Sequence, residues 1–311
     1  MNFPAAMLLA LGLDAAIGWP DALYRRIGHP VTWCGALVSA LETRWNHGSD
    51  SRRRLAGLAT ALLVILLAIA IAALLQAALT HRLANTLLLA ILAWPLIAAR
   101  ALHQHVAAVS KPLGRGDIPA ARRAVSMIVG RDPETLDGPA IARAALESLG
   151  ENASDGIIAP LFWGALFGLP GIAGYKAINT LDSMLGHRSP RYLAFGWAAA
   201  RIDDIANLIP ARLTALLFAL AAAEKRAALR TAWRDARHHR SPNGGWPEAA
   251  MAGALGLRLS GPRIYGNQTA HEPWINAAGR DPGAQDIIAG LALYRRMLLL
   301  AAVGLALAAA L

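Results

Sequence analysis

The run from Leu55 to Leu79 constrains the fold of this chain more than any other feature of the sequence. Apart from Thr60, Gln76 is its one polar side chain. Roughly 20 apolar residues in a helix cross the hydrocarbon part of a bilayer, and a water-soluble domain has no need of such a run. The sequence therefore predicts a transmembrane helix near residues 55–79.

Further segments are apolar enough to associate with a membrane, although each departs from an ideal span. One is broken by Gly168-Leu169-Pro170-Gly171, and another contains Pro210 and Arg212. Apolar residues make up 56% of the chain and are dominated by Ala and Leu, which suits lipid-facing helices. Together with the first run, the expected spans lie near residues 4–18, 55–79, 83–99, 157–178, 205–223 and 290–311.

These features predict an all-α polytopic integral membrane protein that forms a single domain over residues 1–311. About four to five of its helices are expected to be membrane-associated, with amphipathic cytoplasmic helices in residues 100–156 and 224–289. The N-terminal segment lacks a basic n-region, so we do not expect a cleaved signal peptide.

The distribution of basic residues predicts the topology. The net charge is +10, with six arginines in residues 24–54, seven Lys or Arg in residues 100–143 and eleven in residues 224–296. By the positive-inside rule these three segments are cytoplasmic, so we expect a multi-pass protein of the inner membrane. Basic and aromatic residues do not alternate, and nucleic acid is therefore not an expected partner.

The segment 179–204 poses a topological problem. If residues 157–178 and 205–223 both cross the membrane, this segment lies outside, although it is dense in polar side chains. The Gly-Leu-Pro-Gly break allows another arrangement, in which an interrupted helix enters and leaves by the same face. We favour a re-entrant or tilted, partly embedded segment, and both arrangements stay open on the sequence alone.

The first polar cluster is a row of acidic residues that leads into an apolar segment. Asp137 and Pro139 predict the start of a helix, on which Glu147, Glu151 and Asp155 recur at i, i+4 and i+8. Like charges at this spacing oppose helix formation, whereas a bound divalent cation reverses the sign of the effect. The alternative is a solvated acidic face. Because free carboxylates beside a membrane segment are costly, the metal site is an equally good interpretation.

The second polar cluster follows the Gly-Pro break. If the segment is helical, ammonium, amide, hydroxyl and imidazole groups share one face, and the carboxyl group of Asp182 flanks it. Such a stripe suits the wall of a polar cavity better than a lipid-facing surface, and the alternative is a lysine that extends to the membrane surface. The residues of the stripe are Lys176, Asn179, Thr180, Ser183 and His187.

The third polar cluster combines arginines with acidic residues. On a continuous helix, Arg201, Asp204 and Arg212 fall on one face, with Asp203 and Asn207 beside them. An Arg–Asp–Arg ladder either satisfies buried charges structurally or binds phosphate through the guanidinium forks. The sequence leaves these two interpretations open.

Two loops complete the polar set. Gly130-Arg131-Asp132 precedes the acidic helix and brings a cation toward it. The stretch from Ser241 through Asn243 reads as a tight turn that leads into a helix N-terminus, which is a natural anion site, with a plain loop as the alternative.

Several other classes of site are not indicated. The sequence contains no Gly-rich nucleotide fingerprint, zinc-protease motif or nucleophile elbow. Cys34 is the one cysteine, so an intramolecular disulfide is excluded and a small buried thiol is expected. The pairs His103 with His105 and His238 with His239 lack metal-site spacing, and we expect them at the surface.

Taken together, these segments resemble the CobD/CbiB family, the adenosylcobinamide-phosphate synthases of cobalamin biosynthesis. The resemblance covers nearly the whole chain. Its segments are Leu13-Asp14, Gly28-His29-Pro30-Val31, SMIVGRD (126–132), ESLGENASDGIIAPLFW (147–163), YKAINTLDSMLGH (175–187), FGWAAARIDDIANLIPARLTA (195–215) and SPNGGWPEAAMAGALG (241–256). Gly18-Trp19-Pro20 departs from the pattern, because an acidic residue is expected before the proline, and this weakens any role for that turn.

The resemblance implies a membrane-bound ligase that forms an amide bond. Such enzymes join adenosylcobyric acid to (R)-1-aminopropan-2-ol or its O-phosphate, with ATP as co-substrate and Mg²⁺ as cofactor. Membrane lipid and other enzymes of the pathway are expected partners. The oligomeric state stays open, with a homo-oligomer as one alternative.

Carried onto this sequence, the resemblance suggests which residues hold the metal and the phosphates. The expected Mg²⁺ ligands are the carboxylates of Glu151, Asp155 and Asp182, because hard oxygen ligands suit magnesium with phosphate. The cations expected to contact phosphate are Lys176, Arg131 and Arg201, of which Lys176 is also a candidate catalytic residue.

The same resemblance suggests a general base and a substrate-binding set. The amine must lose a proton, and Asp203, Asp204 or His187 is expected to accept it. The residues expected to bind or orient substrate, beside Arg131 and Arg201, are Asn152, Asn179, Ser183, Asn207, Arg212 and Asn243.

Two non-enzymatic interpretations compete with this one. AmpE-like membrane proteins belong to the same superfamily and are linked to signalling, so a sensor is the main alternative. A transporter would also place charges near broken helices, but the sequence shows few secure spans and no inverted repeat.

Overall fold

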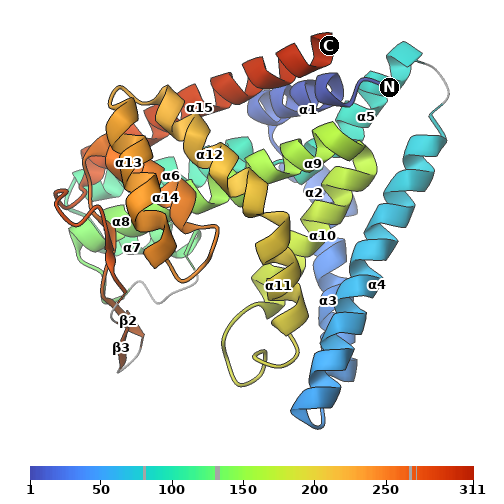
Figure 1. Cartoon of the computed structure of the whole chain (residues 1–311), viewed down its shortest axis with the longest axis horizontal. Helices are drawn as coiled ribbons and strands as arrows, with labels where there is room; N and C mark the ends of the chain where they lie inside the picture. Colours follow the sequence, from blue (N-terminus) through green and yellow to red (C-terminus); the bar gives the residue numbers. More distant parts are fainter. Residues whose placement is uncertain (80–81, 130–133, 266–267, 271) are drawn as a thin grey trace. The chain divides into compact units, whose positions relative to one another are not determined.

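The computed structural model describes residues 1–79, 82–129, 134–265, 268–270 and 272–311, and helices make up most of them (Figure 1). The strands of these residues form two short antiparallel pairings. They are β1 (Leu259–Ser260) with β4 (Trp274–Ile275), and β2 (Arg263–Tyr265) with β3 (Gln268–Ala270). The expected all-α class is therefore confirmed.

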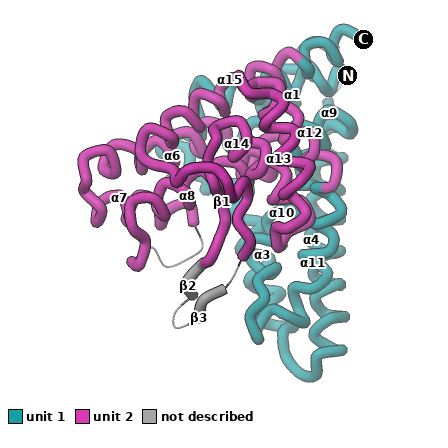
Figure 2. Tube along the Cα trace, turned by 60° about the vertical axis from the view of Figure 1, so that its left-hand side comes forward, with its two compact units in different colours: residues 1–98, 159–207, 304–311 teal, residues 99–158, 208–303 magenta. Residues whose placement is uncertain are grey.

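The chain divides into two compact units, each built from segments that are far apart in the sequence (Figure 2). Unit 1 comprises residues 1–98, 159–207 and 304–311, and unit 2 comprises residues 99–158 and 208–303. The expectation of a single membrane-integral domain over residues 1–311 stays a prediction.

In unit 1, one helix contacts most of the others. This helix is α10, which packs against α3, α4, α5, α9 and α11 around a core that includes Val38, Leu181 and Phe195. The elements of unit 1 are α1 (Phe3–Ile17), α2 (Asp21–Ile27), α3 (Pro30–Trp45), α4 (Asp50–Ala77), α5 (Arg82–Ala93), the 3₁₀ turn η1 (Trp94–Leu96), α9 (Ala159–Phe167), α10 (Leu169–Leu185) and α11 (Trp197–Ala206).

In unit 2, α14 contacts α8, α12 and α13. Its residues Ala249 to Ala252 are fully buried, which places it at the centre of this unit. The helical elements that begin in unit 2 are α6 (Ala99–Gly114), α7 (Ile118–Ser126), α8 (Gly138–Ala153), the π turn η2 (Ser154–Ile158), α12 (Leu208–Ala221), α13 (Lys225–Asp235), the 3₁₀ turn η3 (Ala236–His238), α14 (Gly245–Leu255) and α15 (Ala284–Ala310). The last residues of α15 belong to unit 1.

Several helices are long and apolar enough to cross a membrane. Among the described residues they are Asp50–Ala77, Ala84–Gly114 and Ala284–Ala310. Two bent pairs qualify if each is one span, namely Phe3–Ile17 with Asp21–Trp45 and Trp197–Ala206 with Leu208–Ala221. Three to five spans confirm a polytopic membrane protein, and the individual span boundaries stay a prediction.

The expected break in the segment 157–178 is present. Gly168 ends α9 and precedes α10 with φ +69°, a conformation that favours glycine because a side chain is strained there. Helices α9 and α10 then pack closely, since a Cβ at Gly171 would overlap the Trp163 carbonyl group. Whether this segment is re-entrant stays a prediction.

Candidate functional site

The first candidate site lies in unit 1, where α10 ends and α11 runs past it. Asp182 is in the last turn of α10, and Arg201 and Asp204 are one turn apart on α11. Arg201 Nη1 donates to Asp204 Oδ2 over 2.8 Å, while the negative charges of Asp182 and Asp204 interact with each other. The expected contact of Arg201 with Asp204 is therefore present, and a second carboxylate lies near it.

The Asp182 carboxylate is half-buried and has no hydrogen bond or ion pair within the described part of the chain. Its electrostatic neighbours are Asp204, which opposes its charge, and His187, which favours it. Gly186 lies directly against this carboxylate, since a Cβ there would overlap Asp182 Oδ1. A partly desolvated anion beside a like charge is costly, and a cationic ligand would remove the cost.

His187 lies beyond the helix rather than on it. Helix α10 ends at Leu185 with Gly186 as its C-cap, so the prediction that His187 continues the polar stripe is wrong. The other members of the stripe are on the helix. Thr180 Oγ1 donates to the Lys176 carbonyl group over 2.7 Å, and Ser183 Oγ donates to that of Asn179 over 2.7 Å.

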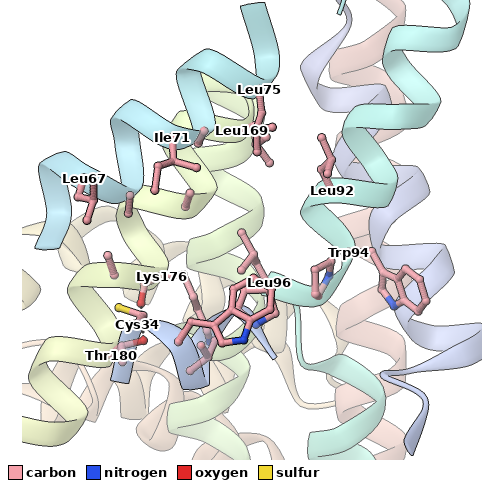
Figure 3. A pocket seen from close by; sticks show the side chains of 18 of the residues that line it. Cys34, Leu67, Ile71, Leu75, Leu92, Trp94, Leu96, Leu169, Lys176 and Thr180 are labelled. Atoms are coloured by element: carbon pink, nitrogen blue, oxygen red, sulfur yellow. Dashed lines mark hydrogen bonds between the residues drawn. The ribbon is translucent and has the colours of Figure 1, made fainter. Parts of the chain in front are cut away.

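Lys176 lines an apolar cavity of about 540 Å³ within unit 1 (Figure 3). Cys34 on α3 and Thr180 on α10 lie near it, while the rest of the lining is almost entirely aliphatic or aromatic. Of the stripe, Lys176 and Thr180 line this apolar cavity, and the polar cavity expected for the stripe as a whole stays a prediction. Cys34 is half-buried, close to the expectation for its thiol.

His29, to which no site role was expected, lies near this cavity. Its imidazole packs edge-on against Trp19 at 5.0 Å between ring centroids, and it interacts electrostatically with Lys176. His29 also caps α3, because its Nδ1 accepts from Val31 N over 3.2 Å. The motif Gly28-His29-Pro30-Val31 was the available signal, but sequence spacing could not place it beside Lys176.

The two candidates Asp203 and Asn207 belong to a buried network of unit 1. Tyr175 donates its hydroxyl hydrogen to Asn207 Oδ1 over 2.8 Å, and Asn207 Nδ2 donates to Asp203 Oδ2 over 3.0 Å. All three residues are buried. Asn207 therefore already uses both ends of its amide, and this arrangement orients Asp203 from inside the protein.

The prediction that Arg212 shares a helical face with Arg201 and Asp204 is wrong. Helix α11 ends at Ala206, and a separate helix, α12, begins at Leu208, so Arg212 lies in another helix and in unit 2. Arg212 Nη1 instead donates to Asn243 Oδ1 over 2.7 Å, and its guanidinium lies over the Trp246 ring.

The Asn243 loop leads into α14 as the sequence predicts. The donors that precede the helix are satisfied internally, because Ser241 Oγ accepts from Asn243 N over 3.2 Å and from Gly244 N over 3.1 Å. This favours the plain loop over an anion site. His239, expected at the surface, is buried with its Nε2 3.6 Å from Glu248 Oε1, so that expectation is wrong.

The acidic helix of unit 2 starts where expected, with Asp137 Oδ1 accepting from Ala140 N over 2.9 Å. Its carboxylates differ in their surroundings. Glu147 is buried and accepts from Ser260 N over 2.7 Å, whereas Glu151 is exposed. The alternative of a solvated acidic face therefore fails for Glu147.

Asp155 is not on the α-helical stripe with Glu151. Helix α8 ends at Ala153, and Asp155 lies in the wider π turn that follows, so the expected i, i+4, i+8 row is wrong in its third member. Single π turns are rare and occur frequently at functional sites, and no simple sequence signal announces them. Nearby, Asn152 Nδ2 donates to the Ser148 carbonyl group over 2.9 Å.

The expected metal ligands do not form a cluster in the part of the chain that the structure describes. Within the described ranges, no three His, Cys, Asp or Glu side chains gather closely enough to hold a metal ion. Glu151 and Asp155 belong to unit 2 and Asp182 belongs to unit 1, so the magnesium assignment stays a prediction. Arg131 lies outside the described residues, and its predicted phosphate contact is likewise untested.

Comparisons with known proteins agree on one relationship. The family model described as "CobD/Cbib protein" matches residues 7–294. A "Cobalamin biosynthesis protein CobD" of Rhodobacter capsulatus is 63% identical over 296 residues, covering 95% of this chain and 94% of the relative.

Two further relatives carry the same name. The protein of a Sinorhizobium species is 48% identical over 93% of this chain and 92% of its own length. The protein of Brucella suis is 48% identical over 92% of this chain and 90% of its own length. No solved structure matches the chain.

Proposed function

The chain belongs to the CobD/CbiB family of cobalamin biosynthesis, and from this membership we propose that it catalyses the amide-bond-forming step. It joins a carboxylate of adenosylcobyric acid to the amine of (R)-1-aminopropan-2-ol or its O-phosphate, which gives adenosylcobinamide or its phosphate. ATP is the co-substrate, Mg²⁺ is the metal, and the protein works in the inner membrane.

The proposed reaction needs an activated carboxylate, because a carboxylate ion is a poor electrophile. A corrinoid carboxylate oxygen bonds to the γ-phosphorus of ATP as the bond from that phosphorus to ADP breaks. The deprotonated amine then attacks the acyl carbon, and the C–O bond to phosphate breaks. The products are the amide, ADP, inorganic phosphate and a proton.

The observation that carries this proposal is the Asp182 carboxylate. It is half-buried beside Asp204 and, within the described residues, has no hydrogen-bond or ion-pair partner. Partial desolvation of this carboxylate beside a like charge costs free energy of folding. A bound divalent cation or cationic substrate would offset this cost. Arg201, whose side chain is 55% exposed, pairs with the neighbouring Asp204 and carries a guanidinium fork suited to phosphate oxygens.

The donor chemistry of this cluster fits magnesium. Mg²⁺ is usually bound through one or two carboxylates together with phosphate oxygens and waters, and Asp182 can supply one such carboxylate. When bound, the ion neutralises the charge that develops on the transferring phosphoryl group. Glu151 and Asp155 belong to unit 2, and their predicted role as metal ligands stays a prediction.

The three candidate bases differ in their surroundings. Asp203 is buried and bonded to Asn207, so it holds the end of α11 rather than meeting a substrate amine. His187 is exposed beyond the helix end, and the side chain of Asp204 is 23% exposed and paired with Arg201. We therefore propose that Asp204 or His187 accepts the proton of the amine.

Turnover on the purified protein tests this function. The detergent-solubilised chain is mixed with adenosylcobyric acid, aminopropanol O-phosphate, ATP and Mg²⁺, and the product and ADP are quantified by mass. We expect amide and ADP in equal amounts, and no product when Mg²⁺ is omitted. If no product forms and the protein retains no corrinoid colour, the sensor interpretation replaces this one.

A further inference from the structure

The loop of residues 186–196 joins the two helices of unit 1 that carry the candidate site (Figure 1). Asp182 lies in the last turn of α10 before the loop, and Asp204 lies on α11 after it. The loop itself carries His187, a candidate base, and Arg188, whose charge favours the Asp204 carboxylate. The path of this loop therefore sets where these groups lie relative to each other.

A group of side chains that we call the clamp holds this loop, and its members are Glu42, Asn46, Arg53 and Arg191. Glu42 lies in the last turn of α3, and its side chain is 7% exposed. Its carboxylate accepts two hydrogen bonds from the guanidinium of Arg191, over 2.9 and 2.7 Å. A buried carboxylate thus binds the side chain of a loop residue through both of its oxygens.

The rest of the clamp holds the backbone of the loop. Asn46, the C-cap of α3, donates from Nδ2 to Glu42 Oε1 over 2.7 Å and to the Arg191 carbonyl group over 3.0 Å. Arg53, in the first turn of α4, donates from Nε to Asn46 Oδ1 over 2.8 Å. Its Nη2 donates to the Pro190 carbonyl group over 3.0 Å and also to that of Arg191. Two successive carbonyl groups of the loop are therefore fixed from both α3 and α4.

Apolar packing also holds the loop, since a Cβ at Gly57 of α4 would overlap the Phe195 carbonyl group. Replacing a buried ion pair by apolar residues often leaves stability unchanged or raises it. Hydrogen bonds to defined carbonyl groups, in contrast, select one conformation of the loop. The polar clamp is therefore better explained by the geometry of the loop than by stability.

We propose that the clamp is a positioning device of the Asp182 site. By fixing the loop, it keeps His187 and Arg188 beside the carboxylates of Asp182 and Asp204. This inference rests on the proposed amide-forming function, because the position of these groups matters for the reaction that they serve. A displacement of a reacting group by about 1 Å can lower the rate about a hundredfold.

A double variant separates positioning from stability. Glu42→Gln alone and Arg191→Gln alone each break the pair, so both should lower the melting temperature and kcat. The two changes together leave no member of the pair charged, so the melting temperature should return close to that of the wild type. We expect kcat to stay about tenfold lower, because the fork that fixes the loop is still missing. The KM for adenosylcobyric acid should change less than about twofold.

Neighbouring arginines of α4 provide a matched control. Arg53→Gln removes the bonds to the loop backbone and should lower kcat, whereas Arg54 is exposed and makes no contact with the clamp. Arg54→Gln should therefore match the wild type in turnover and in melting temperature.

A nitroxide label reports on the loop without turnover. Leu193 is 62% exposed in the loop, and Cys34 is the one cysteine of the chain. The label is attached to Leu193→Cys in a Cys34→Ala background, and its mobility is measured by electron paramagnetic resonance on the full chain in detergent. We expect an immobile label with the intact clamp and with Arg54→Gln, and a faster-moving label in the double variant.

The proposal is overturned if kcat of the double variant recovers together with its melting temperature, or if the label moves no faster in that variant. If the double variant does not fold, the comparison of Arg53→Gln with Arg54→Gln decides, and equal turnover by these two overturns the proposal. A wild type that forms no amide sinks the proposed function and the positioning role with it. An active wild type with an equally active double variant sinks the positioning role alone.

Discussion

The carboxylates of Asp281 in unit 2 and Asp182 in unit 1 have opposite surroundings. Asp281 accepts from Arg258 over 2.8 and 2.5 Å and from Arg143 over 2.6 Å. Both guanidinium groups also lie 4.6 Å from the centroid of the Trp274 ring, so cations, anion and ring form one assembly. Asp182 has a like-charged neighbour and, in the described part of the chain, no such partner.

We interpret paired carboxylates such as Asp281 as stabilising the fold and the Asp182 carboxylate as part of a ligand-binding site. Unit 2 repeats the paired arrangement, because Arg280 binds Asp286 through two hydrogen bonds and Arg234 does the same with Asp235. Paired charges satisfy each other, whereas a half-buried charge without a partner costs stability. Chains keep such groups where the function needs them.

The largest expected effect comes from removing the unpartnered charge. Asp182→Asn keeps the size of the side chain but cannot balance a metal ion, so we expect kcat to fall at least a hundredfold, about 2.7 kcal/mol. Turnover with adenosylcobyric acid measures the effect. Asp50→Asn, an exposed carboxylate with a side chain 79% accessible, is the control and should retain activity. Near-normal turnover by Asp182→Asn would remove Asp182 from the site.

The buried network of unit 1 should behave differently. Tyr175→Phe removes the donor to Asn207 and leaves a buried acceptor unsatisfied, which we expect to cost about 1–3 kcal/mol of stability. Thermal unfolding measures the cost. A fall in the melting temperature with little change in the KM for ATP would mark the network as structural. A rise in that KM alone would place Asn207 among the substrate contacts instead.

In unit 2, Asp281→Asn should reduce stability without a direct effect on chemistry. The side chain is 36% exposed, so the expected loss of about 1 kcal/mol is modest for a carboxylate with two arginine partners. The measurement is the unfolding free energy in detergent, with Glu151→Gln, an exposed carboxylate of α8, as the comparison. Equal stability of the wild type and Asp281→Asn would show that the assembly contributes nothing.

The smallest effect concerns pH. Hydrogen bonds from Arg258, and then from Arg143, lower the pKa of Asp281 from 3.8 to about 2. A depressed carboxyl pKa contributes stability that is fully present above the unfolded pKa near 3.9 and is lost as the pH falls to about 2. Melting temperatures measured between pH 5 and the acid limit should fall less steeply for Asp281→Asn. Parallel curves would contradict this contribution.

The sequence predicted the elements well because apolar runs and capping residues act locally. The run in α4, the Asp137 cap and the Gly168 break all appear where expected. The π turn at Asp155 could not be predicted, because residue spacing alone assumes a continuous α-helix. The helix break at Asn207 had a signal in Pro210, which has no N–H to donate to the carbonyl group four residues earlier, but the spacing argument ignored it. Those two departures account for the misplaced acidic row and the misplaced arginine ladder.

The sequence predicted which residue types the candidate site contains, but not which of these residues contact each other. The residue types suited to metal and phosphate were identified, but which charges are paired depends on contacts between distant segments. Arg143 pairs with Asp281, 138 residues away, which no local pattern announces. The same limit hid the position of His29 beside Lys176, because the two residues lie in different segments of unit 1.

The melting temperature of Asp182→Asn without ligands tests most directly whether the Asp182 carboxylate serves a ligand rather than the fold. If the carboxylate is kept for function at a cost to the fold, removing its charge leaves the melting temperature equal to or above that of the wild type. A clear decrease would show that Asp182 has a structural partner after all, and the contrast between Asp182 and Asp281 would fail.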